Sequence, residues 1–184
     1  MGFEIRLIEF LQAGRHVFFD TSFQIISLAG GFLGVVALSL FFLFFNRKLL
    51  ASYLLSYGFV YAVVKVLKHI IRRPRPFNVS ENIANIGDVV TGFAFPSGQS
   101  ACATAIAIFL GCFLWKRFKK KSTRLCVIIS LVIYVGLVCL SRMYLGKHYL
   151  TDVLAGVVIS AIICLLGLYI VNAIQKNKKV KNEN

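Results

Sequence analysis

One uncharged segment constrains the fold of this chain more than any other feature. Phe23 to Phe45 carries no charged side chain, and about 20 apolar residues are enough for a helix to cross the hydrocarbon core of a bilayer. Four further apolar stretches follow, from Leu49 to about Ile71, from Phe93 to Trp115, from Leu125 to Leu140, and from about Tyr149 to Ile174. The pattern predicts five membrane-spanning helices.

The composition excludes a water-soluble globular domain. Hydrophobic residues make up 58% of the chain and charged residues 15%, whereas a soluble domain has roughly 45–50% apolar and about 25% charged residues. The predicted fold class is therefore all-α, a polytopic transmembrane helical bundle. The five cysteines show no CxxC spacing, so we expect small packing residues rather than a metal site or disulfides.

The two ends of the chain differ from its apolar centre. Residues 1–22 place Glu4, Arg6 and Glu9 among apolar residues at helical spacings, which predicts an amphipathic helix lying in the membrane interface. The sequence thus divides into this interfacial helix (1–22), a transmembrane domain (23–174) and a basic tail (175–184).

The net charge of +14 follows the expected topology. Connections alternate between the two membrane faces, and one face collects more than half of the 21 Lys and Arg residues, in 47–48, 116–124 and 176–181. The positive-inside rule makes that face cytoplasmic. Because these cations lie in short segments between apolar spans, the expected partners are membrane lipids, and nucleic acid is not expected.

Three polar clusters fall on the opposite, outer face. The first ends the second apolar stretch, where Lys68 and Arg75 lie about two helical turns apart and Pro74 and Pro76 favour extended backbone before them. Both cations can converge on one anion. Taken alone, they are also typical of cations that reach from a helix end to the membrane surface.

The second cluster is Pro96-Ser97-Gly98-Gln99, directly before the third apolar stretch. A helix that begins here offers the Ser97 hydroxyl and free backbone N–H groups to an anion, helped by the helix dipole. Taken alone, the same residues are explained at least as well by a simple helix cap.

The third cluster joins the last two apolar stretches and holds Ser141, Arg142, His148 and Asp152. His148 and Asp152 are four residues apart at a helix start, so the carboxylate can accept the imidazole N–H and fix its tautomer. The other nitrogen is then free to attack. A carboxylate within an apolar run is costly, which favours a functional role.

In order and spacing the three clusters resemble the motifs of the type 2 phosphatidic acid phosphatase (PAP2) superfamily: Lys-x6-Arg-Pro, Pro-Ser-Gly-His and Ser-Arg-x5-His-x3-Asp. The corresponding residues here are Lys68 with Arg75-Pro76, Pro96 to Gln99, and Ser141-Arg142 with His148 and Asp152. The resemblance reaches from the second apolar stretch to the last. It implies a PAP2-like bundle of the membrane-bound lipid phosphatase branch.

The resemblance also implies a metal-independent phosphoric-ester or diphosphate hydrolase. His148 would attack phosphorus to give a phosphohistidine, Asp152 would orient His148, and water would resolve the intermediate. Fixed cations would stabilise charge on the phosphate oxygens, so no metal or other cofactor is implied. The implied phosphate-binding residues are Lys68, Arg75, Ser97, Gly98 and Arg142.

Gln99 departs from the family pattern, since the motif has at this place the histidine that protonates the leaving group. The Gln99 amide can bind a phosphate oxygen but cannot act as a general acid near neutral pH. Losing that acid costs on the order of 10²–10⁴ in rate. Gln99 is either an engineered, inactivating substitution or a natural variant, and the retention of the other motif residues favours the first.

The expected substrate is a lipid phosphate or diphosphate at the extracytoplasmic face of the cell membrane. The outward site and the compact chain favour undecaprenyl diphosphate, with phosphatidylglycerol phosphate next. The main alternative is a non-catalytic lipid-phosphate binder or transporter that keeps the phosphate-binding residues, and Gln99 is the feature that recommends it. A transporter unrelated to phosphate would leave the three clusters as coincidence. The sequence indicates no oligomeric state.

Overall fold

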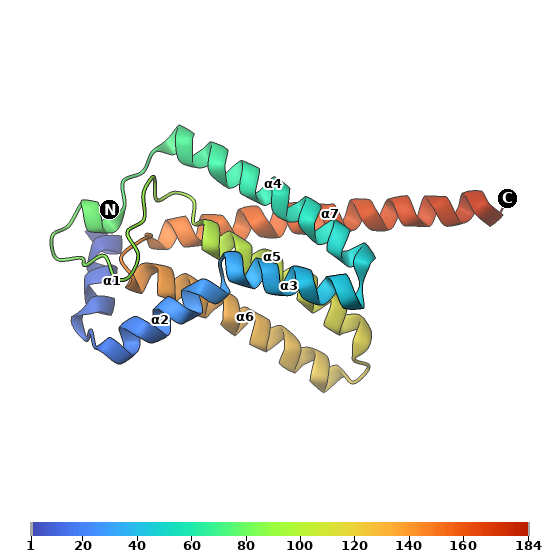
Figure 1. The fold of residues 1–184 in the computed structure, drawn as a ribbon, viewed down its shortest axis with the longest axis horizontal. Coiled ribbons are helices and arrows are strands. Elements are labelled where there is room, and N and C mark those ends of the chain that lie inside the picture. Colours follow the sequence, from blue (N-terminus) through green and yellow to red (C-terminus); the bar gives the residue numbers. More distant parts are fainter. Residues whose placement is uncertain (1, 184) are drawn as a thin grey trace.

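The computed structural model describes residues 2–183, with side chains over 2–174, and the regular elements of this part are all helical. They are α1 (Gly2–Ala13), α2 (Val17–Ala29), α3 (Phe32–Phe45), α4 (Arg47–Ile71), the short 3-10 helix η1 (Pro76–Asn78), α5 (Gly98–Arg117), α6 (Lys121–Tyr144) and α7 (Leu150–Glu183). Figure 1 shows α2 to α7 gathered roughly along one axis, with α1 lying across one end of the bundle. The predicted all-α class is confirmed.

Four helices are long and apolar enough to cross a bilayer: α4, α5, α6 and the part of α7 that ends at Ile174. α2 and α3 pass the same test as a pair, which makes up to five spans. One predicted boundary differs at α5, which begins at Gly98 rather than Phe93. Pro96 disfavours helix before it, and Ser97 caps the first turn of α5.

The first predicted span is not one continuous helix. Instead of running unbroken from Phe23 to Phe45, the chain bends by 44° between α2 and α3, where Gly30 and Gly31 lie. Paired glycines are poor helix formers and common at such bends. A side chain at Gly30 would collide with Val138 of α6. The bend therefore lets this segment pack closely against α6.

The central helix is α5, which packs against α3, α4, α6 and α7. Its Phe109 is fully buried against Tyr53 of α4, and the Tyr53 ring also meets Phe42 of α3 edge to face. The outward faces of α6 and α7 carry exposed apolar side chains, such as Ile133 and Leu166. Large exposed apolar surfaces of this kind suit contact with lipid rather than with water.

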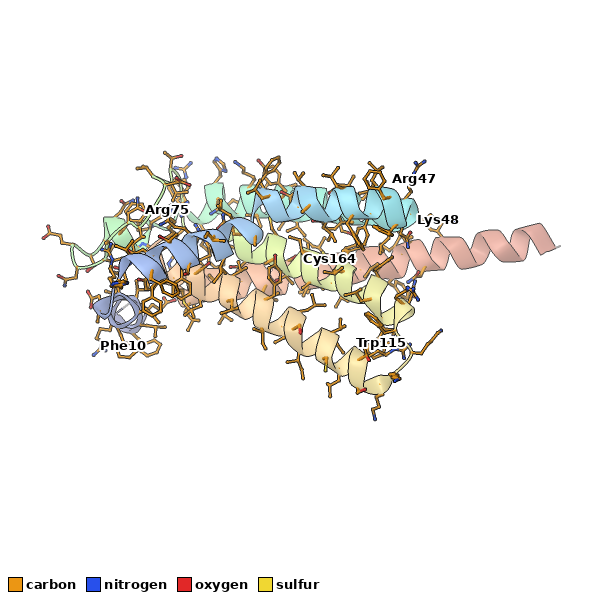
Figure 2. The ribbon with its side chains drawn as sticks, turned by 60° about the horizontal axis from the view of Figure 1, so that its bottom comes forward. Phe10, Arg47, Lys48, Arg75, Trp115 and Cys164 are labelled. Atoms are coloured by element: carbon orange, nitrogen blue, oxygen red, sulfur yellow. The ribbon has the colours of Figure 1, made fainter. Side chains whose placement is uncertain are left out.

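Helix α1 is fixed to the polar connection between α4 and α5. Ile8 is fully buried, and the Gln12 amide donates hydrogen bonds to the carbonyl oxygens of Ala84 (3.0 Å) and Tyr144 (2.7 Å). On the other side Phe10 is 77% exposed and points away from the bundle (Figure 2). Helix α1 therefore covers the end of the bundle with one face and leaves an aromatic face free.

The segment 1–22 is divided, because α1 ends at Ala13 and α2 begins at Val17. The interfacial location of this segment stays a prediction. The basic tail, 175–184, lies outside the residues whose side chains are described.

Candidate active site

The three motif clusters meet at the end of the bundle that α1 covers. The backbone N–H of Ser97, at the start of α5, donates to the carbonyl of Asp152 in α7 (2.9 Å). The Arg75 guanidinium, just after α4, donates to the carbonyl of Lys147 in the connection from α6 to α7 (3.0 Å). Figure 2 places Arg75 at this end and Trp115 at the other. The structure thus brings the sequence-predicted residues into one site.

Three cations give this site its positive charge. Lys68 is half-buried, and its ammonium group donates to the carbonyl of Phe93 (2.7 Å). Arg75 is buried and donates to the carbonyl oxygens of Thr91, Gly92 and Lys147. Arg142 is 5% exposed, and its Nε has no hydrogen-bond partner among the described residues. A buried guanidinium with an unused N–H is costly unless an anion approaches it.

The start of α5 carries Ser97 and Gly98. Ser97 is fully buried and is the N-cap, and its Oγ accepts hydrogen bonds from the backbone N–H (3.4 Å) and the hydroxyl (2.9 Å) of Ser100. Beside Gly98 the nearest atom that an added Cβ would meet belongs to Val64, at 3.8 Å. The helix start is therefore capped, and the space beside the Gly98 Cα is open.

His148 and Asp152 are in contact but do not form the hydrogen bond expected from their spacing. His148 Nδ1 lies 3.7 Å from Asp152 Oδ2, which is beyond hydrogen-bond range, and Nδ1 has no other partner in the described part of the chain. Helix α7 begins only at Leu150, so His148 precedes the helix. Asp152 Oδ2 instead accepts the backbone N–H of Tyr149 (2.9 Å). The carboxylate still faces Nδ1.

Arg73 holds the other oxygen of Asp152, a role that the sequence did not reveal. Its Nη1 lies 2.6 Å from Asp152 Oδ1, and its Nη2 lies 2.7 Å from Glu4 Oε2 of α1. The guanidinium also stacks on the Tyr149 ring, 3.9 Å from the centroid. Arg73 is one of several basic residues around Pro74, and no local pattern links it to the distant Glu4.

Ser27 of α2 connects Gln99 to Arg142. Its hydroxyl donates to Gln99 Oε1 (2.6 Å) and accepts from Arg142 Nη1 (2.6 Å), and the side chain is buried. Gln99 therefore belongs to the same cluster as the cations. Ser27 was not predicted as a site residue, and its only sequence signal is a hydroxyl within an apolar stretch.

A cavity of about 450 Å³ opens beside this cluster. Its polar wall includes Lys68, Arg75, Gly98 and Gln99, and its apolar wall comes from α3 and α4, with Phe32, Tyr57, Val60 and Val64. Arg142 is connected to this cavity through Ser27 and Gln99 rather than lining it. The cavity joins a cationic wall to an apolar one.

The surroundings of His148 favour its neutral form. Burial, together with the nearby cations of Arg142, Arg75 and Lys68, lowers the pKa of His148 to about 3, against the opposing effect of Asp152. The unfolded chain has a histidine pKa near 6.5, so between about pH 6.5 and 3 only the unfolded chain takes up this proton. The free energy of unfolding therefore falls as the pH falls through that range.

Lys147 adds a further positive charge next to His148. Burial, followed by repulsion from Arg142, lowers the pKa of Lys147 to about 8, and its ammonium group donates to the carbonyl of Asp88 (2.9 Å). Lys147 thus stays mostly protonated at neutral pH.

We expect the His148 ring to stay neutral in the folded protein at pH 5. Histidine ring carbons labelled with carbon-13 report this by NMR, since the chain has three histidines and His148→Gln identifies the signal. The His148 signal should keep its neutral position from pH 7.5 to pH 5. A titration of that signal with a midpoint near 6.5 would show that water reaches the ring and that burial and the nearby cations do not lower the pKa of His148.

The apolar helices and the buried cationic cluster at one end of the bundle define a helical membrane protein. The PAP2 superfamily matches residues 49–176, a range that includes the three motif clusters. The chain belongs to this superfamily.

Among curated proteins, phosphatidylglycerophosphatase B of Bacillus subtilis (strain 168) is 38% identical over 120 residues, which are 62% of this chain and 55% of that protein. The chain spans between 29% and 55% of the length of the curated relatives it matches.

Two crystal structures share the fold. The first transmembrane PAP2 type phosphatidylglycerolphosphate phosphatase from Bacillus subtilis superposes with a TM-score of 0.75 at 27% identity, covering 96% of this chain and 86% of that chain. Aquifex aeolicus LpxE superposes with a TM-score of 0.76 at 24% identity, covering 91% of this chain and 95% of that chain. At 24% identity, the similarity to LpxE shows only that the two proteins share a fold.

Proposed function

We propose that this protein is a membrane phosphatase that hydrolyses a lipid phosphate or diphosphate. The observation that carries the proposal is the cavity in which Lys68 and Arg75 face apolar residues of α3 and α4. A lipid with its phosphate at the cations and its tail along the apolar wall matches both surfaces. Membership of the PAP2 superfamily supports the same assignment.

The phosphate is held by fixed positive groups. In this proposal Lys68, Arg75 and Arg142 bind its oxygens, together with the Ser97 hydroxyl and the Gly98 N–H at the start of α5. The phosphate takes the place of the Ser27 hydroxyl at Arg142 Nη1 and also engages the unused Nε. Because these cations are built into the chain, a chelator such as EDTA is expected to leave the rate unchanged.

His148 is the nucleophile in this proposal. Since Nδ1 faces Asp152, Nε2 attacks phosphorus, and the new N–P bond forms as the bond to the leaving oxygen breaks. Asp152 stabilises the positive charge that develops on the ring. The leaving oxygen takes a proton from water, because Gln99 has none to give. A second water then attacks the phosphohistidine, giving inorganic phosphate and the free imidazole.

Arg73 acts in this scheme as a positioning residue for Asp152. It binds the carboxylate oxygen that His148 does not face, and Glu4 in turn anchors it. Losing such an orienting partner leaves the phosphate-binding cations in place while the carboxylate can turn away from the ring.

Arg73→Gln is expected to lower kcat by about 10- to 100-fold with little change in KM, the usual cost of misplacing a catalytic group. Steady-state phosphate release measures both constants. Arg72→Gln is the matched control, because Arg72 is exposed and its Nε donates only to the His69 carbonyl (2.9 Å). Equal kcat values for the two variants would remove Arg73 from the mechanism.

The acidity of the leaving group distinguishes the candidate substrates. With Gln99 in place, a diphosphate is the better substrate on chemical grounds, because the departing lipid monophosphate has a second pKa of about 6 and needs no proton. This favours undecaprenyl diphosphate. The likeness to phosphatidylglycerophosphatase B supports phosphatidylglycerol phosphate as the other candidate.

Phosphate release by the purified chain tests the proposal. Undecaprenyl diphosphate and phosphatidylglycerol phosphate are supplied in bilayers to the protein with Gln99 and to Gln99→His. Release from at least one lipid by Gln99→His is expected. Binding of these lipids without release by either protein would instead favour the non-catalytic binder or transporter.

The proposed orientation puts the site on the extracytoplasmic face of the cell membrane. The basic residues of 47–48 and 116–124 lie at the opposite end of the bundle from Arg75 (Figure 2), and the positive-inside rule assigns that basic end to the cytoplasm.

A further inference from the structure

A second, larger cavity lies at the basic end of the bundle, far from His148. It measures about 1190 Å³ and runs along α5 between α6 on one side and α7 with the start of α4 on the other. Both Figure 1 and Figure 2 show α6 and α7 close together where the chain connects them and diverging toward this end. The divergence leaves a groove that the helices themselves do not fill.

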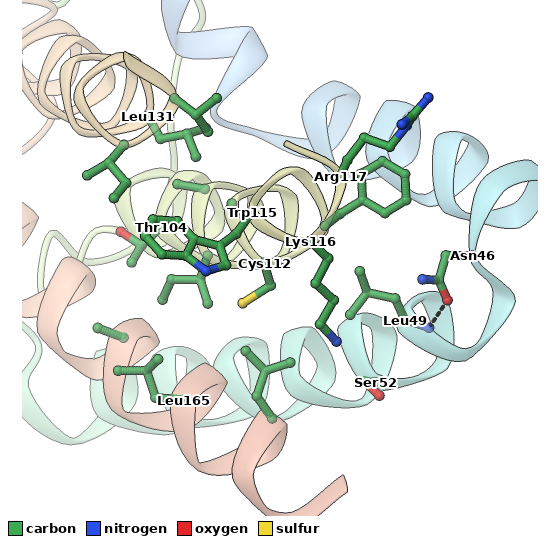
Figure 3. A pocket seen from close by; sticks show the side chains of 18 of the residues that line it. Asn46, Leu49, Ser52, Thr104, Cys112, Trp115, Lys116, Arg117, Leu131 and Leu165 are labelled. Atoms are coloured by element: carbon green, nitrogen blue, oxygen red, sulfur yellow. Dashed lines mark hydrogen bonds between the residues drawn. The ribbon is translucent and has the colours of Figure 1, made fainter. Parts of the chain in front are cut away.

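The groove is apolar along most of its length. Its walls include Ile108 of α5, Leu131 of α6 and Leu165 of α7, and Figure 3 shows Leu131 and Leu165 on either side of the α5 residues Cys112 and Trp115. The lining extends along α5 from Thr104 to Lys116, which is about 18 Å at 1.5 Å per residue. One leaflet of a bilayer has a hydrocarbon depth of about 15 Å, so a single acyl chain fits the groove lengthwise.

The mouth of the groove is cationic. It is lined by Lys48, Lys116, Arg117 and Arg124, and none of these has a carboxylate within 4.0 Å in the described part of the chain. The sequence has no Asp or Glu between Asp20 and Glu81 or between Asp88 and Asp152. No carboxylate among the described side chains balances these charges, which favours an anion from outside the bundle.

We propose that this groove binds one anionic phospholipid of the membrane leaflet at the basic end. Its phosphate lies among Lys116, Arg117 and Lys48, and one acyl chain fills the slot between α6 and α7. Charge complementarity favours this occupant over a zwitterionic lipid, and the length of the slot suits one acyl chain. The cationic mouth is separate from the proposed phosphatase site, because it lies at the end of α5 whereas Gly98 and Gln99 lie at its start.

Trp115 is a built-in reporter for this site. It is the single tryptophan of the chain, it lines the groove, and Arg124 stacks on its ring at 4.5 Å. Lipids with brominated acyl chains quench tryptophan fluorescence at contact range. The full-length protein is reconstituted in bilayers in which brominated phosphatidylglycerol or brominated phosphatidylcholine replaces increasing fractions of the unlabelled lipid.

We expect phosphatidylglycerol to occupy the position next to Trp115 about tenfold more strongly than phosphatidylcholine. In the double variant Lys116→Gln with Arg117→Gln, the two lipids should occupy this position almost equally. Lys119→Gln with Lys120→Gln removes the same charge from the same exposed segment, outside the groove, and should keep the preference. Equal loss in both double variants would show that general surface charge attracts the lipid, which overturns the proposal.

A second pair of variants tests the acyl slot. Ala161→Phe fills the groove from α7, whereas Val158→Phe adds the same ring to a lipid-facing position nearby that does not line it. Ala161→Phe should weaken the preference for phosphatidylglycerol several-fold, and Val158→Phe should not. No quenching by either brominated lipid would mean that protein, such as a second copy, covers the groove, and it would also overturn the proposal.

Discussion

His148→Asn is expected to lower phosphate release from a lipid phosphate by about 10⁴- to 10⁶-fold, the range found when a nucleophile or its partner is removed from a covalent enzyme. Asparagine keeps a polar side chain at this buried position but has no nitrogen lone pair that can attack phosphorus. The loss should fall on kcat, because Lys68, Arg75 and Arg142 still bind the phosphate. Steady-state assays in a Gln99→His background start from the highest rate, so the largest loss of rate can be measured there.

His16→Asn is the matched control for this substitution. His16 lies outside the site and caps α2, accepting the Phe18 backbone N–H at Nδ1 (3.2 Å), and asparagine is itself a good N-cap. Its activity should equal that of the parent. If His148→Asn kept a rate within about tenfold of the parent, a difference of only 1.4 kcal/mol in the barrier, His148 would not be the nucleophile.

Gln99→His is expected to raise the hydrolysis of a lipid monophosphate by about 10²- to 10⁴-fold, the usual contribution of a general acid. An alcohol that leaves a monoester has a pKa near that of water, roughly 15.7, and departs poorly without a proton. Gln99 accepts a hydrogen bond from Ser27 (2.6 Å), so the same serine would orient an imidazole at this position. The other ring nitrogen would then carry the proton for the leaving group.

The rescue should be smaller for a lipid diphosphate. Its leaving group is a lipid monophosphate with a second pKa of about 6, which departs without prior protonation. Values of kcat/KM for one monophosphate and one diphosphate, each with Gln99 and with His at position 99, give the two rescue factors. Equal factors for the two lipids would mean that position 99 does not act on the leaving group.

The sequence predicted the parts of the site that follow local patterns. Lys68, Arg75, Ser97, Arg142, His148 and Asp152 lie at helix ends or in a connection on one side of the bundle, and their place follows from span boundaries and the alternation of loops. The fold class followed from the length of the apolar stretches for the same reason. Such features depend on residues close together in the chain.

Contacts between distant segments were beyond prediction. Arg73 reaches Glu4 of α1, and Ser27 reaches Arg142, through single side chains with no repeating pattern around them. The bend at Gly30 depends on the approach of α6, which no sequence periodicity shows. The missing hydrogen bond between His148 and Asp152 had a local cause, because the exact start of α7 decides it and helix boundaries are the least reliable part of a sequence prediction.

Trapping the covalent intermediate tests the central claim most directly. Gln99→His protein is mixed with a lipid phosphate labelled with phosphorus-32, quenched in alkali within milliseconds to seconds, and digested for mass spectrometry. We expect an acid-labile, alkali-stable phosphoryl group on His148 that disappears in His148→Asn and appears at the rate of turnover or faster. Turnover without label at His148, or label on a different residue, would contradict it.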